Sequence, residues 1–476
     1  MHTMNVRLNV ALVAGSMPNF SPEGPAVYKR NAADLRTVAE EYGFDLTVYE
    51  EIIFTPEQAM SIRQDLDEEG FDLVIIFHPT YIIGDLVCEL MKTDTALGLW
   101  AVEEISDHGS LPLCSLVCMN QNVTIASQHF GGRKIKWFFG STDSRLFKRR
   151  FEITVRALTA VKTVRNARVA QIGQIAPGFL GMHYDDRALF RNLGVTIVHG
   201  IGIEDVVAAA DAIDPDDVLE ETVTLKDRFR TIQVGERKLE DSVRIFLAMK
   251  RICREHGLDA AAFSCWPRLQ ELKNMKPCVS NAMLDSINIP SACEGDMLSA
   301  VSMLILQTLT SEPAAVMDLP AFDIEDDSLL LWHCGSAPFD MADKAGVRCC
   351  YHYRAAFDDK TGDDQDGPVT DMVFAPGPVT VFRLTGEADR FYYFTGELFK
   401  TDKASWDGSR GWVRSLRMYG DPISSIDIMN TILTGGLQHH FPLVLKDVSE
   451  ELEECAAWLG LNREPRIPYT DFLRTD

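Results

Sequence analysis

Short apolar segments alternate with amphipathic helical segments along the first two thirds of this chain, and this alternation restricts the possible folds strongly. Residues 71–77, FDLVIIF, form a continuous apolar run with the length of a buried strand, and a strand-like run also covers 6–14. Helical spacing covers 56–69 and also 25–42, where Gly43 provides a helix stop. Buried strands separated by helices are typical of a parallel sheet covered on both faces. The N-terminal region therefore predicts a doubly wound α/β domain.

A second set of alternating segments begins near Arg168. The run ARVAQIG has the pattern of a strand, helical spacing covers 186–193 and 239–256, and DAAAFSC at 259–265 is another strand. The segment SACEGDMLSAVSMLILQTLT then passes from a turn directly into an apolar helix. This order predicts a second doubly wound parallel-sheet domain.

The last part of the chain changes to the two-residue periodicity of antiparallel strands. GPVTVFRLTG and RFYYFTGEL are rich in β-branched and aromatic residues. They follow an acidic, turn-rich loop over 357–367, and an amphipathic helix over 448–459 comes near the end. We therefore expect a mainly antiparallel, barrel-like β-domain. Because 476 residues are too many for one hydrophobic core, we expect three domains, at 1–165, 166–322 and 323–476.

The chain is strongly acidic, with 70 acidic and 46 basic residues and a formal net charge of −24. Such a charge repels phosphate backbones and anionic lipid, which argues against nucleic-acid and membrane partners. The 11 cysteines include no CxxC pair, a usage typical of free thiols in a reducing compartment. The sequence contains no signal-peptide pattern and no apolar window long enough to span a bilayer. We expect a cytoplasmic protein.

Two carboxylates, Glu294 and Asp296, flank Gly295 where a predicted strand gives way to a helix. Ligands of open α/β sheets bind at the carboxyl ends of the strands, and a glycine there permits close backbone approach. Carboxylate oxygens at such a turn suit a divalent cation such as Mn²⁺ or Mg²⁺. The simpler alternative is that these residues only cap the helix, which requires no ligand.

Further candidates follow other predicted strands. Glu271 comes shortly after the DAAAFSC strand, so it can join the same sheet edge as a ligand or general base. His333 follows an apolar strand, and His439 and His440 follow a glycine turn. Histidine is the commonest nitrogen ligand and carries protons near neutral pH. Each of these residues also has an ordinary structural explanation, as a solvated helix residue or a hydrogen-bonded histidine.

Aromatic and basic residues near Glu271 are candidates for a sugar pocket. Trp266 can stack on the C–H face of a sugar, although core packing is the commoner role of tryptophan. Arg268 can favour an anionic sugar, although a surface salt bridge is the commoner explanation. The sequence contains no P-loop, no GxGxxG order in the GQIAPGFLG turn and no GxSxG elbow.

Several ordered segments resemble L-fucose isomerases, a family of metal-dependent aldose–ketose isomerases. The matching segments are CWPRLQEL, SACEGDMLSAVSMLILQTLTS, LLLWHCGSAPFDMA, GPVTVFRLTG and QHHFPLVLKDVSEELEECAAWLGL, in this order over roughly the last 220 residues. The N-terminal third agrees in architecture and not in motif. The resemblance therefore leaves open which sugar is used, neutral or anionic.

The resemblance implies a catalytic metal, usually Mn²⁺, and a homo-oligomer, a hexamer in this family, with sites between subunits. Carried over by position, the metal ligands fall on Glu271, Asp296 and His440. Glu271 and Asp296 would also move the proton between C1 and C2 through an enediol, and Glu294 would lie behind the ligands. Trp266, Arg268, His333 and His439 would line the substrate pocket.

Two other classes of protein remain possible from the sequence. Two doubly wound domains beside a cleft also describe sugar-binding proteins, so a catalytically degenerate or regulatory relative is the main alternative. A dinucleotide-dependent oxidoreductase has the required sheets but needs a glycine fingerprint that this chain lacks.

Overall fold

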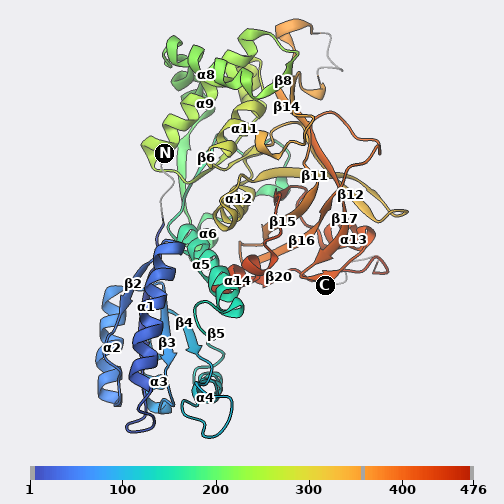
Figure 1. Ribbon diagram of the computed structural model, residues 1–476. Helices are drawn as coiled ribbons and strands as arrows, with labels where there is room; N and C mark the ends of the chain where they lie inside the picture. Colours follow the sequence, from blue (N-terminus) through green and yellow to red (C-terminus); the bar gives the residue numbers. More distant parts are fainter. Residues whose placement is uncertain (1–5, 355–359, 472–476) are drawn as a thin grey trace. The chain divides into compact units, whose positions relative to one another are not determined.

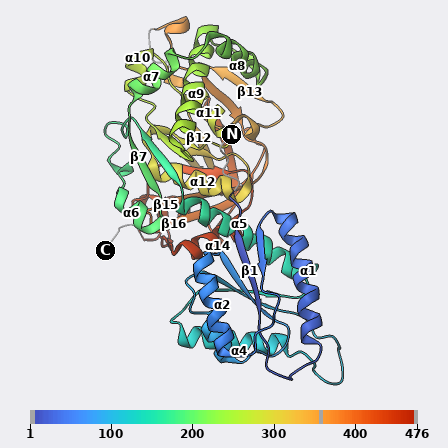
Figure 2. The same cartoon turned by 90° about the vertical axis from the view of Figure 1, so that its left-hand side faces the viewer.

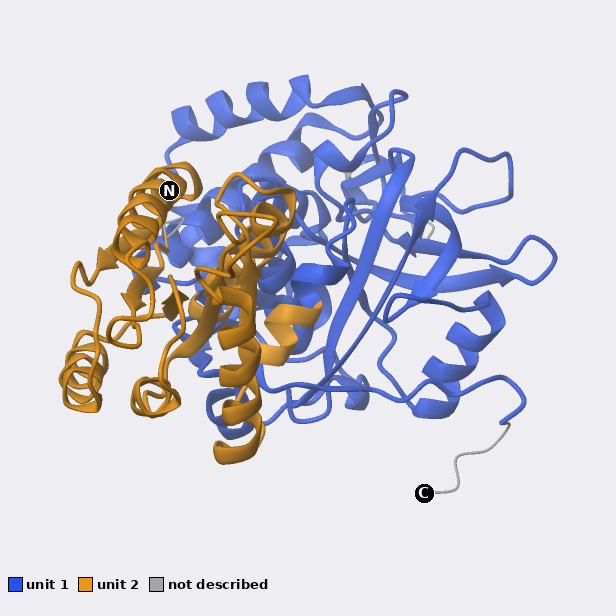
Figure 3. Cartoon of the chain, turned by 60° about the horizontal axis from the view of Figure 1, so that its bottom comes forward, with its two compact units in different colours: residues 1–4, 163–452, 459–476 blue, residues 5–162, 453–458 orange. Residues whose placement is uncertain are grey.

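The computed structural model describes residues 6–354 and 360–471 and divides into two compact units (Figures 1 and 3). Of the described residues, the small unit contains 6–162 and 453–458, and the large unit contains 163–354, 360–452 and 459–471. The segments expected as second and third domains, 166–322 and 323–476, fall largely within the large unit. The acidic loop expected over 357–367 lies partly outside the described residues.

The small unit is built on a parallel sheet of five strands in the order β2-β1-β3-β4-β5. In β1, Val10 and Leu12 pack in one apolar cluster and Ala11 and Val13 in another, so the sheet is covered on both faces. Figure 2 shows α1 and α2 on opposite sides of β1. The strands are β1 (Asn9–Ala14), β2 (Asp45–Val48), β3 (Leu73–His78), β4 (Ala96–Ala101) and β5 (Ile135–Phe139); the helices are α1 (Gly24–Tyr42), α2 (Pro56–Glu69), α3 (Gly84–Leu90), α4 (Ser115–His129) and α5 (Arg145–Arg165).

The large unit begins with a parallel sheet of four strands in the order β10-β9-β6-β7. Helix α12 is buried along nearly its whole length because it packs against this sheet and also against β15 and β19 of the next one. The elements are β6 (Arg168–Ile172), β7 (Thr196–Ile201), β9 (Ala260–Phe263), β10 (Ser291–Ala292), α6 (Asp186–Leu193), α7 (Ile203–Asp211), α8 (Pro215–Asp227), α9 (Glu236–His256), α10 (Arg268–Lys273), α11 (Cys278–Ser286) and α12 (Met297–Thr310).

A mainly antiparallel sheet follows, and six of its strands close into a ring. The ring order is β16-β15-β19-β11-β12-β17, and pairing of β17 with β16 closes it. The predicted barrel-like β-domain is therefore confirmed, and its first strand already begins at Ala315. The ring strands are β11 (Ala315–Asp323), β12 (Ser328–His333), β15 (Gly377–Thr385), β16 (Arg390–Leu398), β17 (Ser409–Met418) and β19 (Phe441–Val444); β8 (Phe229–Ile232), β13 (Val347–Cys350), β14 (Val369–Val373), β18 (Asp421–Pro422) and β20 (Asn462–Arg463) extend the sheet, with helices α13 (Ser425–Gly435) and α14 (Ser449–Leu459).

The fold class expected from the sequence, two parallel-sheet α/β regions followed by a mainly antiparallel β-region, is confirmed. Among the described helices, none is both long enough and apolar enough to cross a bilayer.

Candidate active site

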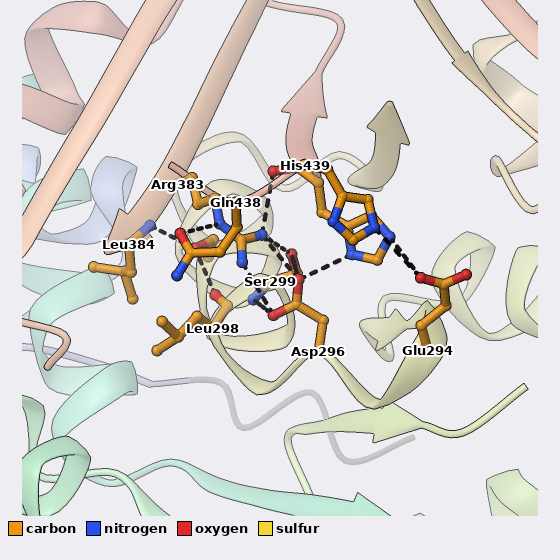
Figure 4. Close-up of polar contacts among 10 residues, drawn as sticks. Glu294, Asp296, Leu298, Ser299, Arg383, Leu384, Gln438 and His439 are labelled. Carbon is orange, nitrogen blue, oxygen red and sulfur yellow. Dashed lines mark hydrogen bonds and ion pairs between the residues drawn. The ribbon is translucent and has the colours of Figure 1, made fainter. Parts of the chain in front are cut away.

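The turn between β10 and α12 presents Glu294 and Asp296 in different directions. Glu294 has a positive φ of 62°, and Gly295 follows with φ 75°. A Cβ on Gly295 would lie 2.9 Å from Gln171 Nε2 and 3.0 Å from the Gln174 carbonyl oxygen, so the expected close backbone approach at this glycine is confirmed. The left-handed residues turn the chain sharply at the strand end. Figure 4 shows Asp296 directed toward Arg383 and Glu294 apart from that pair.

Asp296 is fully buried, and protein groups engage both of its carboxylate oxygens. Its side chain caps α12 by accepting the Ser299 backbone N–H at 3.1 Å and the Ser299 hydroxyl at 2.8 Å. Arg383, on β15 and also fully buried, donates from Nη1 at 2.9 Å and from Nη2 at 3.3 Å. Burial alone would raise the pKa of Asp296, but Arg383 and His440 hold that pKa well below its usual range. The helix-capping explanation therefore applies to Asp296.

His440 lies immediately before β19 and joins the two carboxylates. Its Nδ1 is 2.9 Å from Asp296 Oδ2, and its Nε2 is 3.3 Å from Glu294 Oε2. Burial would lower the pKa of His440, but the carboxylates of Asp296 and Glu294 raise it to about 10. Burial would raise the pKa of Glu294, but contacts with His439 and His440 lower it. An imidazole held through Nδ1 by a carboxylate presents Nε2 in a fixed direction.

The barrel strands add Asp318 and His333 to this group. The antiparallel register pairs Met317 of β11 with Phe441 of β19, so the next pair along is Asp318 and His440. A β-bulge follows Asp318, and bulges commonly redirect side chains beside active sites. His333 is the last residue of β12, the strand on the other side of β11. Ligand atoms of Asp318, His333 and His440 lie within 4.8 Å of one another.

Three buried atoms of this group fit a divalent cation. They are Glu294 Oε2, Asp318 Oδ1 and His440 Nε2, and within the described residues none of them has an aligned hydrogen-bond partner. An unpaired buried polar atom is costly, so these atoms indicate a missing partner. Glu294 and Asp318 belong to two separate groups of potential ligand atoms, and His440 is the residue that the two groups share. Two carboxylate oxygens and one imidazole nitrogen form a ligand set that Mn²⁺ accepts. His439 gives a further nitrogen within 4.8 Å of Glu294 and His440.

Glu271 does not join this group, contrary to its expected place among the ligands. It lies on the short helix α10, its side chain is 56% exposed, and its Oε2 accepts a bond from Arg268 Nη1 at 3.0 Å. Neither of the two potential metal-binding groups among the described residues contains it. The chain turns into α10 soon after β9, and the helix directs Glu271 toward solvent. The ordinary explanation, a solvated helix residue, applies here.

The expected pocket residues separate into two sets. Trp266 packs edge-on against Phe179, and Phe179 packs against His439, whose side chain is 52% exposed beside Glu294. Trp266 and Arg268 line a cavity of about 670 Å³ at the end of the parallel sheet. The guanidinium of Arg268 is engaged by Glu204 at 2.5 Å and by Glu271. His333 is buried on the barrel side of the group, where its Nδ1 lies 3.2 Å from Cys334 Sγ.

Sequence reasoning missed Asp318 and Arg383. Both are charged residues inside strands that otherwise read as apolar or β-branched, VMDLP and TVFRLTG, and both lie in the interior. A charged residue within a buried strand is rare enough to serve as a signal of a site or an ion pair.

Comparison with known proteins finds relatives along most of the chain. The chain is 24% identical over 416 residues to a sulfoquinovose isomerase of Alkalicoccus urumqiensis, covering 86% of this chain and 89% of the relative. It is 22% identical over 421 residues to the sulfoquinovose isomerase of Priestia megaterium, and the match covers 87% of this chain and 89% of the relative. A third sulfoquinovose isomerase, from Clostridium sp. strain MSTE9, is 23% identical over 370 residues and covers 77% and 79%.

No family model matches the chain. Among solved structures, a solute-binding protein of Agrobacterium vitis bound to α-D-tagatopyranose is 10% identical with a TM-score of 0.18, covering 64% of this chain and 90% of that one. The similarity to several isomerases over most of both chains confirms the prediction that this protein is an enzyme of the isomerase class.

Proposed function

We propose that this protein is a divalent-cation-dependent aldose–ketose isomerase that acts on an anionic sugar of the sulfoquinovose type. The observation that carries the proposal is that His440 shares one group of potential ligand atoms with Glu294 and another with Asp318, and that Glu294 Oε2, Asp318 Oδ1 and His440 Nε2 are buried without aligned hydrogen bonds. They come from the end of a parallel sheet, from a bulged barrel strand and from the residue before β19. The aldose–ketose chemistry and the sulfonated substrate class are supported by relatives named sulfoquinovose isomerase.

In this proposal Glu294, Asp318 and His440 hold the cation, and their mixed oxygen and nitrogen donors favour Mn²⁺. Asp296 takes the position behind the ligands, because its oxygens already accept from Ser299, Arg383 and His440. Glu294 thus takes the ligand role first expected for Asp296, and Asp296 takes the supporting role first expected for Glu294. Asp296 orients the imidazole of His440, the usual arrangement around a metal-bound histidine.

Isomerisation requires one proton to move from C2 to C1 of the open-chain aldose and a second proton to move from the O2 hydroxyl to O1. A bound divalent cation would supply Lewis-acid polarisation of the sugar oxygens. In this proposal the carboxylates of Glu294 and Asp318 accept and return the proton as general base and acid. His439, half-exposed beside Glu294, is placed to donate a hydrogen bond to a sugar oxygen. Phe179 and Trp266 offer aromatic faces next to it.

The test is conversion of sulfoquinovose to its ketose by the purified protein, followed by NMR, with added Mn²⁺ and after treatment with a chelator. We expect conversion that is lost on chelation and restored by Mn²⁺. The variant His440→Gln should neither convert the sugar nor regain activity with Mn²⁺. Conversion that is unaffected by complete metal removal would contradict the cation dependence, and conversion of neither sulfoquinovose nor any other aldose would contradict the isomerase assignment.

A further inference from the structure

We propose that the ammonium group of Lys276, together with the N-terminus of α11, receives the anionic substituent of the sugar. This inference rests on the proposed function and identifies the residue that would make the enzyme select an anionic substrate. It follows from the burial of Lys276, from the pairing of the neighbouring cations, and from the connection between Lys276 and the catalytic group.

Lys276 is a buried cation without a counter-ion close by. Its side chain is only 5% exposed, and no carboxylate or hydrogen-bond acceptor among the described residues is within bonding distance of its Nζ. Burial opposes the charge, but the nearby thiols of Cys278, Cys265 and Cys334 and the carboxylate of Asp366 raise the pKa of Lys276. The residue therefore keeps its charge at neutral pH. Buried charges in proteins are normally paired, so this position favours an anionic ligand.

Helix α11 begins two residues after Lys276 and adds to the same effect. Its first residue is Cys278, no side chain caps its N-terminus, and its first turn contains no acidic residue. All residues of this turn are buried. Unsatisfied N–H groups and the helix dipole favour an anion at a helix N-terminus. A sulfonate, with three acceptor oxygens, can bind the N–H groups and the ammonium together.

Three arginines around the site are already paired with carboxylates, whereas Lys276 has no such pair among the described residues. Arg268 is held by Glu204 and Glu271, and Arg383 is held by Asp296. Arg348 is paired with Asp371 and Asp407. Arg354, which also lies near His352, is exposed and bonds the Tyr353 hydroxyl. The charge of Lys276 has no comparable partner.

A short chain of contacts links Lys276 to the catalytic group. Cys278 Sγ lies 3.8 Å from Cys334 Sγ, and Cys334 Sγ lies 3.2 Å from His333 Nδ1. His333 in turn shares a group of potential ligand atoms with Asp318 and His440. Lys276 and the catalytic group thus lie on either side of Cys334 and His333, as a substrate with its anionic group away from the reacting carbons requires.

An open cavity lies beside this chain of contacts. It has a volume of about 850 Å³, and its lining includes Cys334, His352, Tyr353 and Trp332. Burial and the charges of Lys276 and Arg354 lower the pKa of His352 to about 2, so His352 is neutral. In the proposal, Lys276 and the N-terminus of α11 supply the buried positive charge behind this cavity wall.

The experiment compares two sugars that differ only in the sulfonate group at C6, sulfoquinovose and quinovose (6-deoxyglucose), in the Mn²⁺-loaded enzyme. For Lys276→Met we expect kcat/KM to fall about 100-fold or more for sulfoquinovose. The value for quinovose should change less than about threefold, because that sugar offers no anion to Lys276. Mn²⁺ affinity should stay at the wild-type value. The control Lys273→Met, which loses an exposed pair with Asp211, should leave both sugars unaffected.

Equal losses for the two sugars, or no loss for sulfoquinovose, would overturn the assignment and make Lys276 a structural residue. If Lys276→Met does not fold, the same kinetics are measured with Lys276→Gln. In addition, inorganic sulfate is tested as a competitor of sulfoquinovose in the wild-type enzyme. Competitive inhibition by sulfate supports the site, and its absence contradicts it. If the wild-type enzyme converts neither sugar, the proposed function fails, while titration of sulfoquinovose into wild type and Lys276→Met by calorimetry still decides whether Lys276 binds the anion.

Discussion

At the scale of single residues, the two nitrogens of His440 have different environments. Nδ1 contacts Asp296, which Arg383 and Ser299 hold in place, and Nε2 faces Glu294. Arg383 also donates to the His440 carbonyl oxygen at 3.2 Å, so one buried guanidinium fixes both the carboxylate and the backbone of the histidine. This arrangement holds the imidazole ring in one orientation and leaves Nε2 directed toward a ligand.

The two glutamates considered as ligands give a direct comparison of variants. Glu294→Gln should lower kcat/KM about 100-fold or more, because it removes both a carboxylate ligand and a proton acceptor. Glu271→Gln should retain nearly wild-type kcat/KM, because its side chain is exposed and is engaged by Arg268, away from the groups of potential metal ligands found among the described residues. Steady-state kinetics with sulfoquinovose and Mn²⁺ measure both. A reversed order of the two variants would return Glu271 to the mechanism.

Arg383→Met should destabilise the protein by about 3–5 kcal/mol, because it leaves the buried Asp296 carboxylate without its counter-ion. The measurement is the free energy of unfolding from denaturant titration. Arg191→Met serves as the control, because Arg191 and Glu387 form an exposed pair whose loss changes stability little. Equal changes in the free energy of unfolding would show that the buried pair contributes no more to stability than the exposed pair.

The sequence located the SACEGDM turn but could not assign its two carboxylates. Their directions depend on the left-handed conformation of Glu294 and on Arg383, which lies 87 residues from Asp296 along the chain. Asp318 was missed because its neighbours read as an ordinary strand, and only pairing with β19 brings it to His440. The local sequence pattern therefore predicted the turn that carries Glu294 and Asp296, whereas Asp318 and Arg383 join the site through tertiary contacts that the pattern does not contain.

At the scale of elements, three barrel strands and one turn build the site. β11 lies between β19 and β12, so Asp318 is flanked by the strand that follows His440 and the strand that ends at His333. The turn after β10 adds Glu294 from the parallel sheet. Helix α12 joins the two sheets, because it starts at this turn and packs on β15 and β19.

Gly295→Ala should disturb this turn and lower both activity and stability. A Cβ at Gly295 would come within 3.0 Å of Gln174 O and 3.1 Å of Ile175 Cα, and the residue also requires a positive φ. The matched control is Gly420→Ala, which has φ 84° but no atom within 4 Å of the added Cβ, and so tests backbone strain alone. We expect Gly295→Ala to reduce the melting temperature and kcat/KM more than the control does. Equal melting temperatures and activities of the two variants would contradict the crowding at Gly295.

Helices with clear end signals were predicted closely from the sequence, whereas sheet connections were not. The predicted helices at 56–69 and 186–193 match α2 and α6. α2 carries a Thr55–Gln58 capping box and ends at Gly70, and Asp185 caps α6. Closure of the barrel by pairing of β16 with β17 depends on contacts between distant segments, for which the two-residue periodicity contains no information.

At the scale of the whole molecule, a chain with a net charge of −24 is proposed to bind an anionic sugar. The acidic field opposes this, so a local positive charge from the cation and from Lys276 is required to attract the substrate. The homo-oligomer, a hexamer in the resembling family, stays a prediction that light scattering on the purified protein tests.

Mn²⁺ should stabilise the folded protein because the site exists only when the large unit is folded. Binding at 100 times the dissociation constant adds about 2.7 kcal/mol to the free energy of unfolding. Thermal unfolding with and without Mn²⁺ measures this increase, and His440→Gln should abolish it. A melting temperature that Mn²⁺ leaves unchanged in the wild-type protein would speak against a folded-state site.

The central claim is that one divalent cation is bound by Glu294, Asp318 and His440. Crystals soaked in Mn²⁺ and measured for anomalous scattering test it most directly. We predict one strong anomalous peak at about 2.2 Å from a carboxylate oxygen of Glu294, a carboxylate oxygen of Asp318 and Nε2 of His440, with Asp296 still bonded to Nδ1. A fully soaked crystal with no peak at these three atoms, or with the cation bound through Glu271 or Asp296, would contradict the account.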